Sequence, residues 1–379
     1  MSFFYHFTHQ FGYIDDHVFF LERSGSASAK ALREQGQCLV ADDLGIHYLA
    51  TKEIFKSDLL GCFNIGYLPE VLLVCSNPDQ LTEVIGDLVN LLEHAHQVGQ
   101  LSAATLPFPI IVLCANGIYF QRLRLLFLEK LEESVLFGRL PDLWPDLMPR
   151  IVAHILRGVT LQTGVREGSG GTAVYRPGPH GITRIAGGDP VIRRRCCHLL
   201  GELGGWFEQA DNDSVTHLEF DKAMTNLSTN LLGQIYGIDE EGRFTPLTIG
   251  HMLHGRQNEE IRELSSWVFR IGQAVKAYGE EDDFEERFRA CMESLRLHKT
   301  HIPSSVQWIG LHYAAGTLEP KLAPTEAWLL GPLIRYARGA NLEDAAHYLE
   351  VLKCRLLEKL QKAANRQDRT IISDQPVIR

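Results

Sequence analysis

Apolar positions in the first half of the chain alternate between continuous runs and helical spacing. Two runs, within PEVLLVCSNP (69–78) and PFPIIVLCANG (107–117), are uninterrupted, which is typical of strands buried on both faces of a sheet. Residues 81–96 and 122–133 follow these runs with apolar side chains at helical spacing. A strand, loop and helix repeated in this order predict a parallel α/β sheet.

Shorter elements are predicted around this sheet. They are a strand over 17–22 (HVFFLE), a helix over 26–35, two strand-like pieces in CLVADD (38–43) and IHYLAT (46–51), an irregular insertion over 134–150, a hairpin formed by TAVYRPG and GITRIAG within 159–188, and a helix over 193–208. All of these elements precede the polar run 209–214 and are assigned to one α/β domain.

The second half of the chain has almost only helical periodicity. The predicted helices are 218–237, 246–278, 282–299, 302–315, 324–338 and 342–365. The polar run 209–214 before them is the best linker candidate. The predicted fold class is therefore an α/β domain (residues 1–213) followed by an all-α domain (residues 214–379).

The helix over 218–237 carries an unusual polar stripe. Lys222, Asn226 and Asn230 recur every four residues between apolar side chains, which places them along one face of a helix. Buried ammonium and amide groups are costly unless they meet partners. The stripe is therefore a candidate site, although by base rate such a pattern is more often a solvated helix face.

Ligands of parallel α/β sheets bind beyond the carboxyl ends of the strands. The loops after the predicted strands carry Arg23, then Ser76 with Asn77, and then Asn116 with Gly117. These side chains are candidate ligand-binding groups, although Asn116-Gly117 alone also fits an ordinary turn.

Composition narrows the function classes. The 379 residues are 45% apolar, and the formal charge of -10 argues against nucleic acid and anionic membrane surfaces. There is no signal-like N-terminus and no apolar stretch of spanning length, so we expect a cytoplasmic protein. The eight cysteines form no CxxC pair and are expected to be buried thiols. The histidine pairs 94/96, 251/254 and 298/301 are interpreted as solvated helix faces, and no metal site is predicted.

The order of these features resembles the ketopantoate reductase family, an NADPH-dependent group within the 6-phosphogluconate dehydrogenase-like superfamily. The resemblance extends from about residue 17 to about residue 340. It rests on the K-x-x-x-N-x-x-x-N helix, on the Asn-Gly loop at 116–117, and on SSVQ (304–307) followed by Thr325-Glu326. The glycine-rich stretch 164–188 is also similar to the hairpin region of the family.

The resemblance implies a reductase of a small 2-keto acid, of the kind used in pantothenate biosynthesis. Lys222 would be the general acid that protonates the ketone oxygen, with Glu326 near the lysine and the nicotinamide ribose. Asn226, Asn230 and Ser304 would hold the hydroxyl and carboxylate of the substrate. From their positions alone, Ser304 is also a helix N-cap candidate and Glu326 a favourable first-turn acid.

On the cofactor side, the resemblance implies NADPH. Asn116 would contact both cofactor and substrate, beside Gly117. Arg23, at the end of the second Rossmann strand, would accommodate the 2′-phosphate. Ser76 and Asn77 would line the same edge of the sheet. A homodimer is the expected assembly, with no nucleic-acid or membrane partner.

Two features depart from the family pattern. A first strand with a G-x-G-x-x-G turn should precede the first helix, but this sequence has neither before residues 3–14, the expected first crossover helix. Asn77 also stands where the family usually has a lysine. We therefore expect weakened NADPH binding, and the alternative function is a catalytically silent or truncated relative that binds a metabolite or partner.

Overall fold

The chain consists of two units that are described separately. The structure, a computed structural model, describes residues 1–10, 18–21, 27–50, 54–56, 58–102, 104–139, 144–167, 174–178, 181–201, 206–211 and 213–373. The α/β unit comprises Met1–Ala115 and Phe120–Val215, and the helical unit comprises Asn116–Tyr119 and Thr216–Arg379. The predicted fold class is confirmed, whereas the domain boundary near residue 213 stays a prediction.

A five-stranded sheet with the order β11-β10-β7-β6-β5 is the centre of the α/β unit. Its strands are β5 (Val71–Val74), β6 (Ile110–Leu113), β7 (Ile155–Thr160), β10 (Thr183–Ala186) and β11 (Phe207–Gln209). The strands β5, β6 and β7 are parallel to one another, and β10 runs antiparallel to β7. All four residues of β6 are buried, as its continuous apolar run predicts for a central strand.

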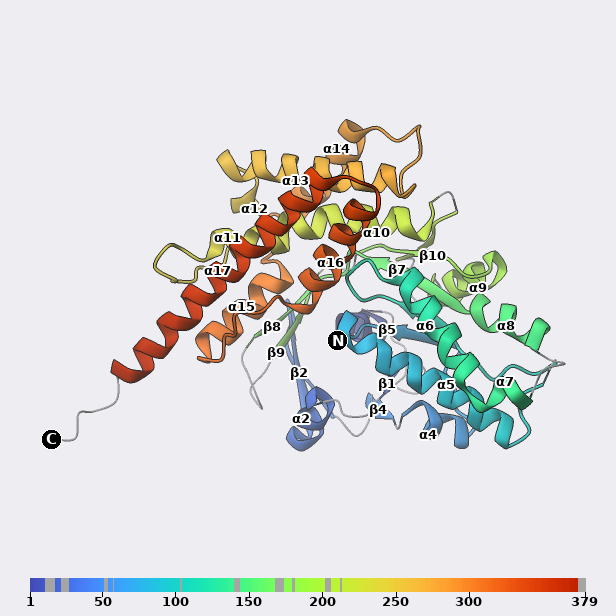
Figure 1. Cartoon of the computed structure of the whole chain (residues 1–379). Coiled ribbons are helices and arrows are strands. Elements are labelled where there is room, and N and C mark those ends of the chain that lie inside the picture. The colour runs from blue at the N-terminus through green and yellow to red at the C-terminus, as the bar shows by residue number, and fades with distance from the viewer. Residues whose placement is uncertain are drawn as a thin grey trace. The chain divides into compact units, whose positions relative to one another are not determined.

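Helices flank this sheet in the sequence. They are α4 (Leu59–Asn64), α5 (Leu81–Gln97), α6 (Phe120–Glu133), α7 (Val135–Arg139), α8 (Trp144–Ala153) and α9 (Pro190–Gly201), with the 3-10 turn η2 (Pro78–Gln80) before α5. The helices α5 and α6 lie side by side (Figure 1). The prediction of an irregular insertion over 134–150 is wrong, because α7 and most of α8 lie there. The helix predicted over 193–208 ends earlier, and β11 follows it.

The first part of the α/β unit forms two smaller sheets. A four-stranded sheet has the order β3-β2-β9-β8 and a two-stranded sheet pairs β1 with β4. Their strands are β1 (Phe20–Leu21), β2 (Gln37–Asp42), β3 (Gly45–Ala50), β4 (Phe55–Lys56), β8 (Gly164–Glu167) and β9 (Val174–Pro177), and the helical pieces are α1 (Ser2–Tyr5), η1 (His6–Gln10) and α2 (Ala27–Gln35). The predicted hairpin is wrong in its partners, since β9 pairs with β8 and β2 while β10 joins the large sheet.

The helical unit is built around one long helix with a change of winding. It runs through α10 (Val215–Asn226), the π-helix η4 (Leu227–Leu231) and α11 (Leu232–Gly237). The other helices are α12 (Ile249–Met252), α13 (Gly255–Ala274), α14 (Phe284–Leu297), α15 (Ser304–Ala314), α16 (Pro324–Gly339) and α17 (Glu343–Ser373). All six helices predicted here exist, although the first piece of 246–278 is the separate short helix α12.

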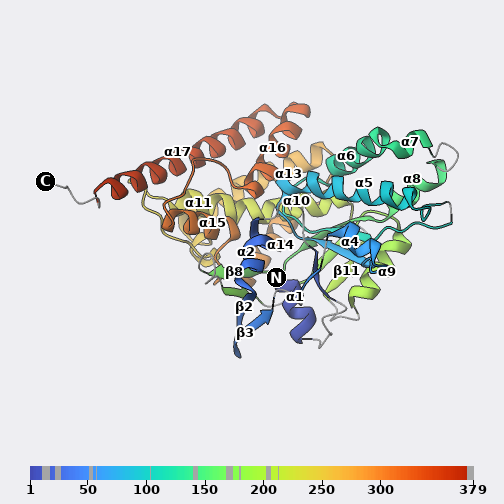
Figure 2. The same cartoon turned by 90° about the horizontal axis from the view of Figure 1, so that it is seen from below.

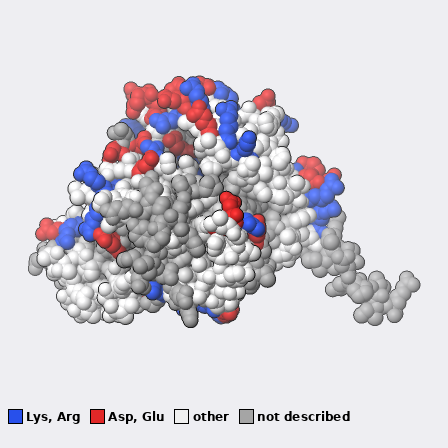
Figure 3. Space-filling view, turned by 180° about the vertical axis from the view of Figure 1, so that it is seen from behind, with Lys and Arg blue, Asp and Glu red and all other residues white. Residues whose placement is uncertain are grey.

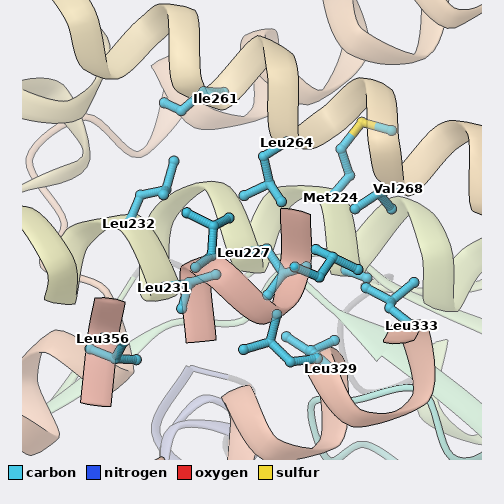
Figure 4. Close-up of a cluster of buried hydrophobic side chains, with 14 of the residues drawn as sticks. Met224, Leu227, Leu231, Leu232, Ile261, Leu264, Val268, Leu329, Leu333 and Leu356 are labelled. Atoms are coloured by element: carbon cyan, nitrogen blue, oxygen red, sulfur yellow. The ribbon is translucent and has the colours of Figure 1, made fainter. Parts of the chain in front are cut away.

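The helical unit has a continuous apolar core. Figure 4 shows Leu264 and Val268 of α13 facing Met224 and Leu227 on one side of the long helix. On the opposite side lie Leu329 and Leu333 of α16 and Leu356 of α17. Helices α16 and α17 are neighbours in both cartoon views (Figure 2). Because each buried leucine contributes about 1.5–3 kcal/mol, this core fixes the long helix on two sides.

A short segment from the middle of the α/β sequence belongs to the helical unit. The amide of Ile118 donates to the carbonyl of Trp328 on α16 (3.0 Å), and Ile118 is part of the core of the helical unit. The amide of Tyr119 donates to the carboxylate of Glu219 on α10 (3.2 Å). The loop after β6 is thereby fixed to the helices that carry the predicted catalytic residues.

Charged side chains of both signs cover the outer helices of the helical unit. At the top of Figure 3 they are mixed over the region of α13 and α14. One such pair joins Arg262 of α13 to Glu285 of α14. Mixed charges of this kind produce no single-sign field for a polyanion. None of the helices described has an apolar stretch sufficient to cross a lipid bilayer.

Candidate functional site

The polar stripe lies on the long helix, but the helix is not uniformly α. Lys222 and Asn226 belong to α10, whereas Asn230 lies inside the π-helix η4. An α-helix has 3.6 residues per turn, so a spacing of four residues slightly exceeds one turn. A π-helix, whose hydrogen bonds run from i to i+5, is wound more widely, so the same spacing is slightly less than one turn. The stripe thus passes from α-helical to π-helical winding between Asn226 and Asn230, and its role as one polar face stays a prediction.

Asn230 makes hydrogen bonds that organise the start of α15. Its Oδ1 accepts from the amide of Ser305 (3.0 Å) and from the hydroxyl of Ser304 (3.4 Å). The first N–H groups of a helix have no partner within the helix, so this side chain replaces an N-cap. The structure thus brings Asn230 and Ser304 together, with Ser304 exposed and Asn230 buried.

Glu326, in the first turn of α16, is fully buried. Burial raises its pKa to about 7, and nearby hydroxyl and amide groups of Ser305 and Gln234 only partly oppose this change. Neither carboxylate oxygen has a well-formed hydrogen bond to another part of the chain that the structure describes. A carboxyl group in such surroundings favours its neutral, protonated form.

Lys222 lies on the part of α10 that faces the end of α14. Its positive charge contributes to lowering the pKa of His298 and His301, whose largest cause is burial. The pKa of Glu326 is instead governed by burial and by the side chains of Ser305 and Gln234. The electrostatic contact of Lys222 with these two histidines adds two neighbours to the predicted site, and its pairing with Glu326 stays a prediction.

Asn226, one of the predicted substrate-binding residues, is buried and has a side-chain N–H donor without a hydrogen-bond partner among the described residues. The residue is 5% exposed, and its Nδ2 has no hydrogen-bond partner within the described ranges. An unsatisfied buried amide costs about 1–3 kcal/mol, so a bound polar molecule would remove this cost. This side chain lies one helical turn from Lys222.

The Asn116–Gly117 loop adopts a conformation that requires glycine. Gly117 has φ +136°, and a Cβ there would lie 3.1 Å from the Cβ of Trp328. Any other residue would be strained in this backbone region. The loop carries Asn116, which is half-buried and belongs to the helical unit.

The remaining predicted cofactor residues belong to the α/β unit. Ser76 follows β5, and its Oγ is buried with no hydrogen-bond partner in the described parts of the chain. Asn77 is exposed and caps η2, where its amide donates to Gln80 Oε1 (3.2 Å). Arg23 lies outside the described residues.

Sequence reasoning missed four neighbours of the site. Gln234 continues the four-residue spacing, and its Nε2 donates to the Asn230 carbonyl (2.9 Å). Ser305 follows the predicted Ser304. His298 and His301 were expected on a solvated helix face, but both are half-buried, so that prediction is wrong. In the described part of the chain, no three His, Cys, Asp or Glu side chains are grouped to hold a metal.

Comparison of sequences identifies no relative, since no family model and no curated protein matches the chain. Solved structures match it over nearly its whole length. These neighbours are Rossmann-type oxidoreductases with a helical C-terminal domain, and their likeness to this chain confirms the expected class of fold.

Particular structures can then be named. A D-mandelate dehydrogenase in complex with NADH and anilino(oxo)acetate matches 96% of both chains, with a TM-score of 0.63 and 16% identity. The 2-dehydropantoate 2-reductase of Methylococcus capsulatus matches 94% of both chains (TM-score 0.55, 15% identity). A dimeric ketopantoate reductase of Staphylococcus aureus matches 96% of this chain and 95% of its own (TM-score 0.55, 14% identity). The resemblance to ketopantoate reductases is therefore confirmed at the level of the fold.

Proposed function

We propose that this protein is an NADPH-dependent reductase of a small 2-keto acid, similar to ketopantoate reductase. The observation that carries the proposal is the buried amide donor of Asn226, left without a partner one turn from Lys222. A helix that is buried in an apolar core and still presents these groups is best explained by a polar ligand. The fold shared with dehydrogenases and reductases supports this reading.

Lys222 is the proposed general acid. When hydride reaches a carbonyl carbon, negative charge develops on the oxygen, and a nearby ammonium stabilises this charge and then gives its proton. His298 and His301 have lowered pKa values because of burial and the charge of Lys222. Near neutral pH these neighbours therefore stay uncharged and do not repel the ammonium group.

The amides are the proposed substrate-binding groups. The free Nδ2 of Asn226 can donate to a carboxylate or hydroxyl of the substrate. Asn230 already uses its Oδ1 to cap α15, so its proposed role is to hold Ser304 in place as well as to contact substrate. Asn116 is proposed to complete the substrate set. Because its pKa is raised to about 7, Glu326 would be protonated below pH 7 and would then donate a hydrogen bond rather than only accept one.

NADPH would supply the hydride. The orphaned Oγ of Ser76 at the carboxyl end of β5 fits a cofactor hydroxyl or phosphate oxygen. Asn77 beside it, together with Gly117 and Asn116, is proposed to contact the same molecule, and Arg23 is proposed to receive the 2′-phosphate. A homodimer remains part of the proposal, and size-exclusion chromatography with light scattering would test it.

The decisive experiment is NADPH oxidation with a panel of 2-keto acids, including ketopantoate and the keto acid formed from mandelate. Lys222→Ala should lower kcat by about 10²-fold or more, as loss of a general acid does. Lys353→Ala, at another half-buried helix lysine, should leave kcat unchanged. Equal rates for wild type and Lys222→Ala would refute the assigned acid.

A second candidate function is a catalytically silent relative that binds a metabolite or partner. Within the described residues, the five-stranded sheet begins at β5, and neither β1 nor β4 pairs with it. Titration calorimetry with NADPH discriminates the two candidates. Micromolar binding favours the reductase, whereas absence of binding together with tight binding of a keto acid favours the silent relative.

A further inference from the structure

Two cysteines lie side by side at the carboxyl edge of the large sheet. Val74 of β5 is paired with Leu113 of β6 in the parallel register. The next residues are Cys75 and Cys114, and the amide of Cys114 still donates to the carbonyl of Val74 (2.9 Å). Neighbouring strands lie about 4.8 Å apart, which falls within the range of about 4.4–6.8 Å between the Cα atoms of a disulfide.

The two thiols differ in a way that suits thiol oxidation. Cys75 is exposed, which corrects the expectation of buried thiols throughout, and Cys114 is buried. Cys114, as hydrogen-bond partner, is the largest cause that lowers the pKa of Cys75, and the same interaction raises the pKa of Cys114. An accessible, more acidic thiol next to a protected one has the arrangement of an attacking and a resolving cysteine.

We propose that Cys75 and Cys114 form a reversible disulfide when the protein meets hydrogen peroxide. The thiol of Cys75 loses its proton and, as a thiolate, attacks one peroxide oxygen. The O–O bond breaks, the released hydroxide takes up that proton, and a sulfenic acid and one water result. The thiol of Cys114 then attacks this sulfur, and its proton leaves with the hydroxyl as a second water. Two thiols are oxidised by two electrons in total, and one peroxide is reduced to two waters.

The position of the pair gives the disulfide a consequence. Cys75 directly precedes Ser76 and Asn77, so a bond to Cys114 would restrain the loop proposed to hold the cofactor. This consequence rests on the proposed function, whereas the disulfide itself does not. We expect the oxidised protein to bind NADPH more weakly than the reduced protein.

Peptide mapping tests the bond directly. The full chain is treated with hydrogen peroxide, its remaining thiols are blocked with N-ethylmaleimide, and it is digested with a glutamate-specific protease. Cleavage after Glu70, Glu83 and Glu93 places Cys75 in peptide 71–83 and Cys114 in peptide 94–129, apart from Cys62. The expected product is these two peptides joined with the loss of two hydrogens, and dithiothreitol should separate them.

Cysteine variants test whether Cys75 and Cys114, rather than other thiols of the protein, form the disulfide. In Cys114→Ser, dimedone should label Cys75, because the sulfenic acid has no resolving thiol. In Cys354→Ser, which removes another exposed thiol, the linked peptides should form as in wild type. Absence of the linked peptides, or a bond from Cys75 to Cys38 or Cys196 instead, would overturn the proposal.

The cofactor measurement separates the two proposals. If the linked peptides form but the reduced protein does not bind NADPH, the proposed function fails and the disulfide stands. If the reduced protein binds NADPH and no linked peptides appear, the disulfide fails and the proposed function stands.

Discussion

At the scale of single residues, a carboxyl group inside a helical core makes stability depend on pH. Glu326 has a pKa raised from 4.5 to about 7 by burial. The unfolded chain releases this proton near pH 4.5, while the folded chain keeps it up to about pH 7. The unfolded state thus binds fewer protons in this interval, and the free energy of unfolding falls as pH rises through it.

Replacing the carboxyl group should remove this dependence. Wild type should lose about 3 kcal/mol of unfolding free energy between pH 4.5 and 7.5 from this group, whereas Glu326→Gln should not. Urea denaturation of both proteins across this range measures the difference. Parallel curves for the two proteins would show that Glu326 is ionised in the folded state.

Asn230 has a structural role that can be separated from substrate binding. Asn230→Ala removes the acceptor of the Ser305 amide (3.0 Å) and should lower the free energy of unfolding by about 1–3 kcal/mol. Asn258→Ala, at an exposed position of α13, should change it by less than about 0.5 kcal/mol. If Asn230→Ala changes only KM and leaves the urea midpoint unaltered, the capping role is wrong.

At the scale of elements, the close approach of α11 and α15 depends on a missing side chain. A Cβ at Gly233 would lie 2.9 Å from Val306 Cγ2, and overpacking of this kind costs about 1–3 kcal/mol. The gain in helix propensity offsets about 1 kcal/mol of this cost. Gly233→Ala should therefore lower the free energy of unfolding. The double variant Gly233→Ala/Val306→Ala should lose less than the sum of the two single losses, because the smaller side chain at position 306 leaves room for the new Cβ.

A matched glycine provides the control for this experiment. Gly86 lies within α5, and a Cβ there would meet no atom within 4 Å. Gly86→Ala should stabilise the protein by up to about 1 kcal/mol. Thermal unfolding of wild type, Gly233→Ala, Val306→Ala and the double variant completes a double-mutant cycle. A coupling energy of zero between positions 233 and 306 would contradict the proposed contact.

At the scale of the whole molecule, one segment of the helical unit, Asn116–Tyr119, lies between two segments of the α/β unit in the sequence. Ile118 lies between β6 and α6 of the α/β unit, yet it is 4% exposed within the core of the helical unit. Ile118→Ala should cost about 2–4 kcal/mol. Hydrogen exchange should show the loss of protection in α16 and α10, and a loss confined to β5–β7 would contradict this assignment.

Several features could be read from residues alone. The continuous apolar runs predicted β5 and β6 as strands. All of β6 is buried, whereas in β5, at the edge of the sheet, only Val74 is fully buried. The helices after residue 215 followed from periodicity. The polar stripe with Lys222, Asn226 and Asn230 could also be found, because polar residues between leucines in a buried helix are costly. Which of these groups touch a ligand stays a prediction.

Other features could not be read, because they depend on contacts far apart in the sequence. Local spacing cannot reveal a π-turn, so the change of winding at Leu227–Leu231 was missed. The partners of β9 and β10 depend on pairing with distant strands, so the hairpin was misassigned. The half-buried state of His298 and His301 depends on packing around the end of α14.

The sequence by itself determined the alternation of strands and helices over residues 71–133, the helical second half and the residue types of the candidate site, because these follow from local periodicity and the cost of burying polar groups. Only the tertiary structure decided that burial raises the pKa of Glu326 to about 7, that Asn230 caps α15, and that Cys75 lies beside Cys114. These properties arise from desolvation and from neighbours distant in the chain, which no local pattern records.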